Sequence, residues 1–173
     1  MRKVKLFIAN SLDNYIARPD GAVDWLFTDG DYGMSDFFQS VDAALLGRKT
    51  YDVALTLGKG GEAAFRGMKY YVFSRTPSKS KNKNVQFVSD NIGKFVEQLK
   101  QAKGKDIWLM GGGELTASFL NENLLDELVL TVHPVLPGSG IPLFPGQHRQ
   151  IDLRLVQSRS YESGIVQLHY CLK

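Results

Sequence analysis

The sequence predicts an α/β fold with a mostly parallel central sheet and an antiparallel hairpin at its C-terminal end. Short runs of β-branched and aliphatic residues recur along the chain and are typical of buried strands. Segments of helical character separate several of these runs, as expected for parallel strands joined by crossover helices. The last two runs, residues 154–161 and 165–172, are separated only by Glu162-Ser163-Gly164, which is a hairpin turn signal.

The remaining elements follow from the same patterns. The other apolar runs predict strands at residues 3–9, 41–46, 69–73, 85–88, 106–110 and 125–132. Ile92, Phe95, Val96 and Leu99 have the spacing of one helical face, and Asp90 is placed to cap that helix. Further helices are expected at residues 31–39, 48–57 and 113–121.

Segments rich in Gly, Pro, Asn, Asp and Ser predict the loops. One loop, at residues 11–21, should wrap over an edge, and a Pro/Gly-rich loop should cover residues 134–145. The glycines of residues 58–61 predict a flexible break. Residues 76–84 are basic but contain no aromatic side chain, so they predict a solvated loop rather than a nucleic-acid-binding arm.

Length and composition exclude several classes of protein. A chain of 173 residues is long enough for a real core, and we expect residues 1–173 to form a single domain. A net charge of +3 suits phosphorylated small molecules and argues against nucleic acid as a partner. The lone Cys171 and three scattered histidines predict no disulfide and no metal site. The apolar run after Lys3 is too short for a signal peptide or a membrane span, so a cytoplasmic protein is expected.

A glycine follows the predicted strand at residues 41–46. Arg48, Lys49 and Thr50 come directly after Gly47 and begin the next predicted helix. Free backbone N–H groups and the positive end of the helix dipole favour an anion there, and two cationic side chains add to the attraction. The motif predicts a phosphate site, with a plain strand-to-helix turn as the alternative.

A second polar turn follows the predicted strand at residues 69–73. It contains Ser74, Arg75 and Thr76. Arginine binds phosphate oxygens through two parallel hydrogen bonds, and the two hydroxyls are supplementary donors. A charged hydrogen bond contributes about 1.5–3 kcal/mol, which is enough to favour a 2′-phosphate by tenfold or more. The alternative is an exposed arginine with a structural role.

The third turn is the most glycine-rich. Gly111, Gly112 and Gly113 lie between a predicted buried strand and a helix that begins with Glu114 and Leu115. Successive glycines let a backbone approach a pyrophosphate without interference from side chains. The pattern is not the fingerprint of a Rossmann domain, and a tight turn is the alternative. Because ligands of open α/β sheets bind outside the carboxyl ends of strands, we expect the three turns to hold one ligand together.

The order of these motifs resembles the dihydrofolate-reductase superfamily over nearly the whole chain. Within it, the sequence is most similar to stand-alone relatives of the reductase domain of the bacterial riboflavin-biosynthesis deaminase–reductase. The resemblance implies a three-layer α/β/α fold, a cis peptide bond at Gly111-Gly112 and NADPH as the cofactor. It is carried by residues 8–17 with Pro19-Asp20-Gly21, by Gly47-Arg48-Lys49-Thr50-Tyr51, by Ser74-Arg75, by Gly111-Gly112 and by residues 134–144.

The resemblance also implies roles for single residues. Ala9 and Ile16 would offer backbone groups to the nicotinamide, and Trp25 would lie near the substrate pocket, unless it is a core tryptophan. Independently of the resemblance, the place of Glu114 at the start of a predicted helix predicts that it complements the helix dipole or touches the cofactor. The chain departs from folate reductases at Gly30, which stands where those enzymes carry an acid. Asp31, next to it, or water is the expected proton source.

The resemblance implies an NADPH-dependent oxidoreductase that transfers a hydride to a small heterocyclic or sugar-phosphate substrate. The expected activity is that of a 5-amino-6-(5-phosphoribosylamino)uracil reductase. One alternative is a dihydrofolate or pterin reductase. Another is a non-catalytic protein that binds NADPH or an antifolate. Because the last hairpin could pair between subunits, a homodimer is also expected.

Overall fold

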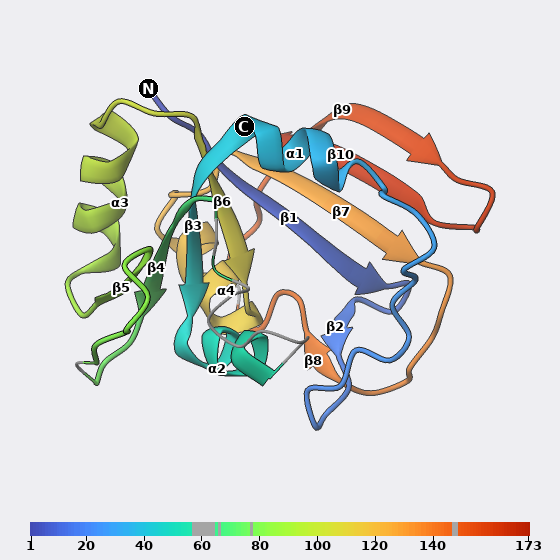
Figure 1. The fold of residues 1–173 in the computed structure, drawn as a ribbon. Helices are drawn as coiled ribbons and strands as arrows, with labels where there is room; N and C mark the ends of the chain where they lie inside the picture. Colours follow the sequence, from blue (N-terminus) through green and yellow to red (C-terminus); the bar gives the residue numbers. More distant parts are fainter. Residues whose placement is uncertain (57–64, 66, 77, 147–148) are drawn as a thin grey trace.

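A computed structural model shows one eight-stranded sheet flanked by helices and a second, two-stranded sheet (Figure 1). It describes residues 1–56, 65, 67–76, 78–146 and 149–173. The predicted break at residues 58–61 lies outside the described residues, as does residue 57 at the end of a predicted helix. Among the described residues, no helix combines the length and the apolar character that a membrane crossing requires.

The main elements match the predicted ones closely. The large sheet contains β1 (Val4–Ser11), β3 (Val41–Gly47), β4 (Lys69–Phe73), β5 (Val85–Val88), β6 (Asp106–Gly111), β7 (Glu127–His133), β9 (Leu153–Ser160) and β10 (Val166–Leu172). The helices are α1 (Met34–Ser40), α2 (Arg48–Thr56), α3 (Ile92–Gln101) and α4 (Gly113–Asn121).

The strand order confirms the predicted topology. The order is β5-β4-β3-β6-β1-β7-β10-β9, and the first six strands are parallel to one another. β10 is antiparallel to both β7 and β9, so the C-terminal hairpin forms one edge of the sheet. This is the mixed, mostly parallel sheet that alternating strands and helices predict.

Helices cover the two faces of the sheet and form two cores. On one face, Val96 of α3 and Phe119 of α4 pack in the same cluster as Leu45 of β3. On the other face, Tyr51 of α2 packs in the same cluster as Leu46, the next residue of β3. Successive strand residues point to opposite faces, so an unbroken apolar run such as that of β3 supplies both cores. The resulting three layers are those of dihydrofolate-reductase-like proteins.

Three local features differ from the predictions. The expected loops contain two short strands, β2 (Tyr15–Ala17) and β8 (Ile141–Pro142), which pair with each other. A Cβ on Gly140 would lie 2.2 Å from the carbonyl oxygen of Ala17, so the close approach of these segments requires a glycine. The cap of α3 is Asn91 rather than Asp90, and its side chain accepts a hydrogen bond from the N–H of Lys94.

α1 begins later than expected. Its first residue is Met34, because Gly33 has a φ of 80°, in the left-handed region that ends regular helical geometry. Asp31 and the two residues after it therefore form the turn that leads into the helix. This places Asp31 ahead of α1 rather than inside it.

One buried carboxylate joins three strands at the amino end of β7. Glu127, 5% exposed, lies 2.6 Å from Nζ of Lys3, 3.6 Å from Nζ of Lys5 and 3.0 Å from Nε2 of His169. Burial raises the pKa of Glu127, but the hydrogen bond from Lys3 and the charge of Lys5 outweigh it, and His169 adds to their effect. The pKa therefore lies below its usual value.

We predict that Glu127→Gln lowers the free energy of unfolding by about 2 kcal/mol at neutral pH, because the lysines lose their buried partner. A carboxyl whose pKa is depressed by folding stabilises the protein above its unfolded-state pKa, and that stabilisation is lost as pH falls through the folded-state pKa. The deficit of the variant should therefore shrink in acid. Urea unfolding at pH 7 and in acid, with the exposed Glu97→Gln on α3 as control, measures this difference. An equal deficit at both pH values would contradict the ion-pair account.

Candidate functional site

The three predicted turns lie side by side at one end of the sheet. β4, β3 and β6 are neighbours, with Gly47 paired to Phe73 of β4 and Leu46 paired to Gly111 of β6. Because the strands are parallel, the chain leaves all three at the same edge (Figure 1). The expectation that these turns converge is confirmed, and the site they form combines segments far apart in the sequence.

The glycines at the ends of β3 and β6 add no side chains of their own to the space between these strands. A Cβ on Gly47 would lie 4.0 Å from the carbonyl oxygen of Gly111, and a Cβ on Gly112 would lie 3.3 Å from Oγ1 of Thr50. Gly111 has a φ of 107°, a value that L-residues rarely adopt. The peptide bond between Gly111 and Gly112 is cis, as the resemblance implies. Any side chain at Gly112 would project toward Thr50.

Two helices begin at this edge from opposite faces of the sheet. α2 starts at Arg48, directly after β3, and α4 starts at Gly113 with Gly112 as its N-cap. The first N–H groups of a helix have no partner within it, and Gly112 has no side chain to satisfy those of α4. The side chain of Leu115 is buried in the core, so this residue can offer only its N–H to a ligand. Both helix ends favour an anion between them.

Charged side chains surround the two helix ends. Lys49 Nζ and Glu114 Oε1 lie 3.5 Å apart, and both side chains are highly exposed. An exposed pair of this kind is weak, so either partner is available to a ligand. Lys49 and Glu114 therefore bridge the carboxyl ends of β3 and β6.

Arg48 points the other way, toward the second turn. Its guanidinium donates to Asp52 at 2.9 Å and to Oγ of Ser78 at 2.9 Å, and it lies 5.4 Å from the ring centre of Phe87. These contacts place its charge beside the segment after β4 rather than beside α4. Arg48 therefore lies, like Arg75, beside the segment that follows β4.

The turn after β4 is stabilised by the hydroxyl of Ser74. Ser74 Oγ donates to the carbonyl oxygen of Thr76 at 2.9 Å and accepts from the N–H of Thr76 at 3.2 Å. This arrangement leaves the exposed side chain of Arg75 at the outside of the turn. The turn is ordered by local contacts, and Arg75 is accessible to a ligand.

The opening segment completes the other end of the site. The Cδ1 of Ile16 lies 3.9 Å from the position of a Cβ on Gly112, so β2 reaches the glycine turn. Ala9 lies on β1, directly beside β6, and pairs with Thr131 of β7. Both residues that the resemblance assigns to the nicotinamide thus lie at the same edge of the sheet as the three turns.

A glycine is required at position 113 by packing rather than by the approach of a ligand. A Cβ there would lie 2.5 Å from the carbonyl oxygen of Pro142 and 2.9 Å from Cδ of Pro145. The third glycine therefore allows α4 to pack against the segment around β8. The sequence motif alone suggested an approach to a ligand, and it could not distinguish this packing role.

Trp25 lies in a small aromatic cluster at the ends of β1 and β7. It is 8% exposed, and its ring lies 5.4 Å from that of His133, which also contacts Phe27 at 5.3 Å. Burial lowers the pKa of His133, although hydrogen bonds to the carbonyls of Thr131 and Asn10 partly oppose this shift. Both predicted roles of Trp25 remain compatible with its placement. No sequence motif selects His133, because the three histidines are far apart and have no metal-type spacing.

Asp31 serves as a local cap. Its carboxylate accepts hydrogen bonds from the hydroxyl of Ser35 at 2.6 Å and from the N–H of Ser35 at 3.1 Å. The side chain is exposed, and the bonds from Ser35 lower its pKa. A group that stays ionised at neutral pH is a poor proton donor. These contacts argue against the predicted role of Asp31 in catalysis.

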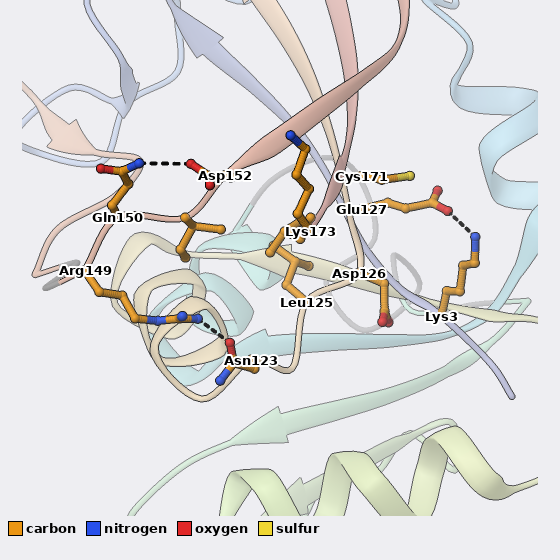
Figure 2. A pocket seen from close by; sticks show the side chains of 12 residues that line it. Lys3, Asn123, Leu125, Asp126, Glu127, Arg149, Gln150, Asp152, Cys171 and Lys173 are labelled. Carbon is orange, nitrogen blue, oxygen red and sulfur yellow. Dashed lines mark hydrogen bonds and ion pairs between the residues drawn. The ribbon is translucent and has the colours of Figure 1, made fainter.

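A cavity of about 520 Å³ opens at the opposite end of the sheet. Figure 2 shows that polar groups lining it hold one another: Lys3 with Glu127, Gln150 with Asp152, and Arg149 with Asn123. It adjoins the amino end of β7, whereas the three turns lie at the carboxyl ends of the parallel strands. The candidate site is therefore the glycine-lined edge, not this cavity.

Comparisons with known proteins point to one family. The family model described as the RibD C-terminal domain matches residues 2–167. Two Bacillus subtilis (strain 168) proteins described as uncharacterized are also similar. YwjB is 41% identical, covering 98% of this chain and 97% of YwjB, and YyaP is 39% identical, covering 98% and 94%.

Solved structures show the same architecture. A protein from Shewanella sp. PV-4 named for riboflavin biosynthesis matches with a TM-score of 0.86 and 28% identity, covering 99% of both chains. The deaminase/5-amino-6-(5-phosphoribosylamino)uracil reductase of Thermotoga maritima matches with a TM-score of 0.77 and 14% identity. That match covers 99% of this chain but 57% of the other, and at this identity it shows the fold alone.

We predict that Gly113→Ala lowers the free energy of unfolding by about 1–3 kcal/mol, because the new methyl group would overlap the backbone of Pro142. Alanine normally stabilises a helix relative to glycine by about 0.5–1 kcal/mol, so the sign of the effect is diagnostic. Gly93→Ala in the first turn of α3 is the matched control, since its Cβ would meet only side-chain atoms, Oε2 of Glu122 at 3.0 Å and Oδ1 of Asn91 at 3.4 Å. Thermal unfolding compares the two. A stabilised Gly113→Ala variant would contradict the packing role.

Proposed function

The chain belongs to the RibD C-terminal domain family, and we propose that it is an NADPH-dependent reductase acting on a small heterocyclic or sugar-phosphate substrate. The supporting observation is that three turns, at Gly47, Ser74 and Gly111, lie at neighbouring strand ends, where glycines add no side chains of their own between β3 and β6. This arrangement combines two helix N-termini with three cationic side chains at a single edge. A ligand with several phosphates is the group that such an edge favours.

The residues fit the pyrophosphate of a dinucleotide. Gly47 and Gly112 leave room for a ligand to approach the backbone, and any Cβ on Gly112 would intrude toward Thr50. The first N–H groups of α2 and α4 would donate to phosphate oxygens from the two faces of the sheet. Lys49 would leave its exposed ion pair with Glu114 and add its positive charge to the phosphate site.

The turn after β4 suits the phosphate that distinguishes NADPH from NADH. Arg75 is exposed there, with the hydroxyls of Ser74 and Thr76 on either side of it. Arg48 reaches the same region through its hydrogen bond to Ser78. Two guanidinium groups beside one turn would bind a 2′-phosphate through charge-assisted hydrogen bonds. We assign the adenosine end of the cofactor to this turn.

The nicotinamide end would then lie toward β1 and β2. The backbone groups of Ala9 and Ile16 would orient the ring, and Trp25 would form part of the wall of the substrate pocket. When bound, NADPH supplies a hydride, and a proton completes the reduction of a C=N or C=O group of the substrate. Because Ser35 holds Asp31 in its ionised form, we assign this proton to water rather than to Asp31.

The proposed substrate is 5-amino-6-(5-phosphoribosylamino)uracil. Family membership supports this choice, and so does the fold shared with the Thermotoga maritima enzyme whose name carries that activity. Gly30 stands where folate reductases carry an acid, which disfavours dihydrofolate. The non-catalytic alternative requires the same cofactor site without turnover. Assays of NADPH binding and of turnover with each substrate therefore separate the uracil reductase, the dihydrofolate reductase and the non-catalytic protein.

We predict that Arg75→Ala weakens NADPH binding tenfold or more and leaves NADH binding unchanged, because a charged hydrogen bond to the 2′-phosphate contributes about 1.5–3 kcal/mol. Fluorescence titration of wild type and variant with both cofactors measures this. Arg154→Ala, which removes an exposed arginine from the distant strand β9, is the matched control and should behave as wild type. Equal affinity of the wild type for both cofactors would refute the role of Arg75.

We predict that the protein oxidises NADPH with 5-amino-6-(5-phosphoribosylamino)uracil and not with dihydrofolate. Turnover is measured as the loss of NADPH absorbance. Asp31→Asn should retain kcat within about threefold, since asparagine can still cap Ser35 and a true general acid contributes 10²–10⁴-fold.

Three results would revise this account. Turnover of dihydrofolate would favour the pterin-reductase alternative. Tight NADPH binding without oxidation of NADPH on either substrate would favour the non-catalytic one. A loss of kcat above about 100-fold in Asp31→Asn, with NADPH affinity unchanged, would identify Asp31 as the proton donor.

A further inference from the structure

Residues 29–33 connect the aromatic cluster around Trp25 to α1 through an unusual backbone conformation. Figure 1 shows the chain that leads into α1 passing the carboxyl ends of β1 and β7. Tyr32 has a φ of 48° and Gly33 a φ of 80°, so two successive residues are in the left-handed region, which a tyrosine rarely adopts. Such a conformation persists only where surrounding contacts hold it, and it is concentrated at functional sites.

One side chain of β10 holds this segment. Nε2 of Gln167 donates a hydrogen bond to the main-chain carbonyl oxygen of Tyr32 at 2.9 Å. Among the described residues, no other hydrogen bond joins the main chain of residues 29–33 to a strand. The ring of Tyr32 also lies 4.9 Å from the ring of Tyr161, which directly follows β9. Gln167 therefore fixes where the segment lies relative to the sheet.

The same amide sets the direction of a buried hydroxyl proton. Nε2 of Gln167 lies 3.1 Å from Oγ1 of Thr131 on β7. A main-chain carbonyl oxygen can only accept, so the group beside Tyr32 is the NH₂ of the amide, and its second proton is donated to Thr131. The hydroxyl proton of Thr131 must then point away from Gln167. Thr131 is 4% exposed, and no residue in the described part of the chain accepts that proton.

Ala9 lies on the other side of Thr131. The strand register pairs Thr131 with Gln167 of β10 and with Ala9 of β1, so the three residues share one face of the sheet. This is the face that α1 covers, because the ring of Phe7, two residues before Ala9, lies 4.5 Å from that of Phe37. Ala9 is only half-buried although β1 is a central strand. A group bound beside Ala9 would meet a donor that has no other partner, and buried donors are rarely left unpaired.

We propose that Gln167 is a positioning residue for the substrate, because it holds residues 29–33 in place and directs the hydroxyl proton of Thr131 toward an acceptor on the substrate. This inference rests on the proposed function, which places the substrate near Ala9 and Trp25. The acceptor is a carbonyl oxygen or an unprotonated ring nitrogen, and a pyrimidinedione offers carbonyl oxygens. An analogue with an N–H group at that point would be rejected, since it would leave two donors facing each other.

Gln167→Glu is the variant that separates polarity from packing. It keeps the size of the side chain and replaces the NH₂ with a second acceptor oxygen. A glutamate would repel the carbonyl oxygen of Tyr32 and accept the proton of Thr131, so both effects of Gln167 would be lost. Gln157→Glu adds the same charge to the exposed neighbouring strand β9 and is the matched control.

Hydrogen exchange of the full chain tests the hold on residues 29–33 without any ligand. The amides of Met34, Ser35 and Phe37 donate to Asp31 or Gly33, so their protection depends on this segment. They should exchange at least about tenfold faster in Gln167→Glu, because the loss of one buried hydrogen bond shifts the local opening equilibrium by that factor. Gln157→Glu should exchange as the wild type does.

Calorimetric titration tests the hydroxyl of Thr131. The titrant is 5-amino-6-(5-phosphoribosylamino)uracil in the presence of NADP⁺, which has no hydride to donate. Thr131→Val and Gln167→Glu should each weaken its binding about tenfold or more, whereas Thr131→Ser, which keeps the hydroxyl, should bind as the wild type does. The affinity for NADPH should not change in any of them. Thr131→Val nearly preserves the shape of the side chain and keeps the test open if Gln167→Glu does not fold.

Three results would overturn the inference. These are unchanged exchange in a folded Gln167→Glu variant, unchanged pyrimidine affinity in Thr131→Val, and an equal loss of pyrimidine and NADPH affinity in both variants. A wild type that binds NADPH but not this pyrimidine would contradict the proposed substrate instead. The exchange measurement would then still decide whether Gln167 holds residues 29–33.

Discussion

The candidate site depends on the close approach of two backbones at the carboxyl ends of β3 and β6. A Cβ on Gly47 would lie 4.0 Å from the carbonyl oxygen of Gly111, and a Cβ on Gly112 would lie 3.3 Å from Oγ1 of Thr50. This spacing leaves the N-termini of α2 and α4 open toward one another from the two faces of the sheet. The proposed anion binding and the proposed assignment of the cofactor both depend on that opening.

The parallel sheet makes this arrangement possible. Because six neighbouring strands run in the same direction, turns separated by many residues in sequence meet at one edge. The same edge receives β2, whose Ile16 approaches Gly112, and the end of β7, whose His133 supports Trp25. The proposed binding and hydride-transfer regions are thus consecutive parts of one surface. The hairpin of β9 and β10 lies beyond β7.

The sequence predicted the parts of the fold that local patterns specify. Apolar runs located β3 and β6, and the polar or glycine-rich strand ends at Gly47, Ser74 and Gly111 were correctly expected to lie close together. The two strands β2 and β8 were missed because they are two or three residues long and exist only through their pairing. The packing role of Gly113 depends on a tertiary neighbour, Pro142, and the capping role of Asp31 depends on the detailed geometry of the turn before α1. No periodicity in a single sequence reports such contacts.

A crystal structure of the full chain grown with NADPH tests the central claim most directly. We expect the pyrophosphate between residues 47–50 and 112–115, with the 2′-phosphate beside Ser74 and Arg75. Density for the dinucleotide at the opposite end of the sheet, near Lys3 and Arg149, would contradict it. So would a bound cofactor whose phosphates touch none of the three turns.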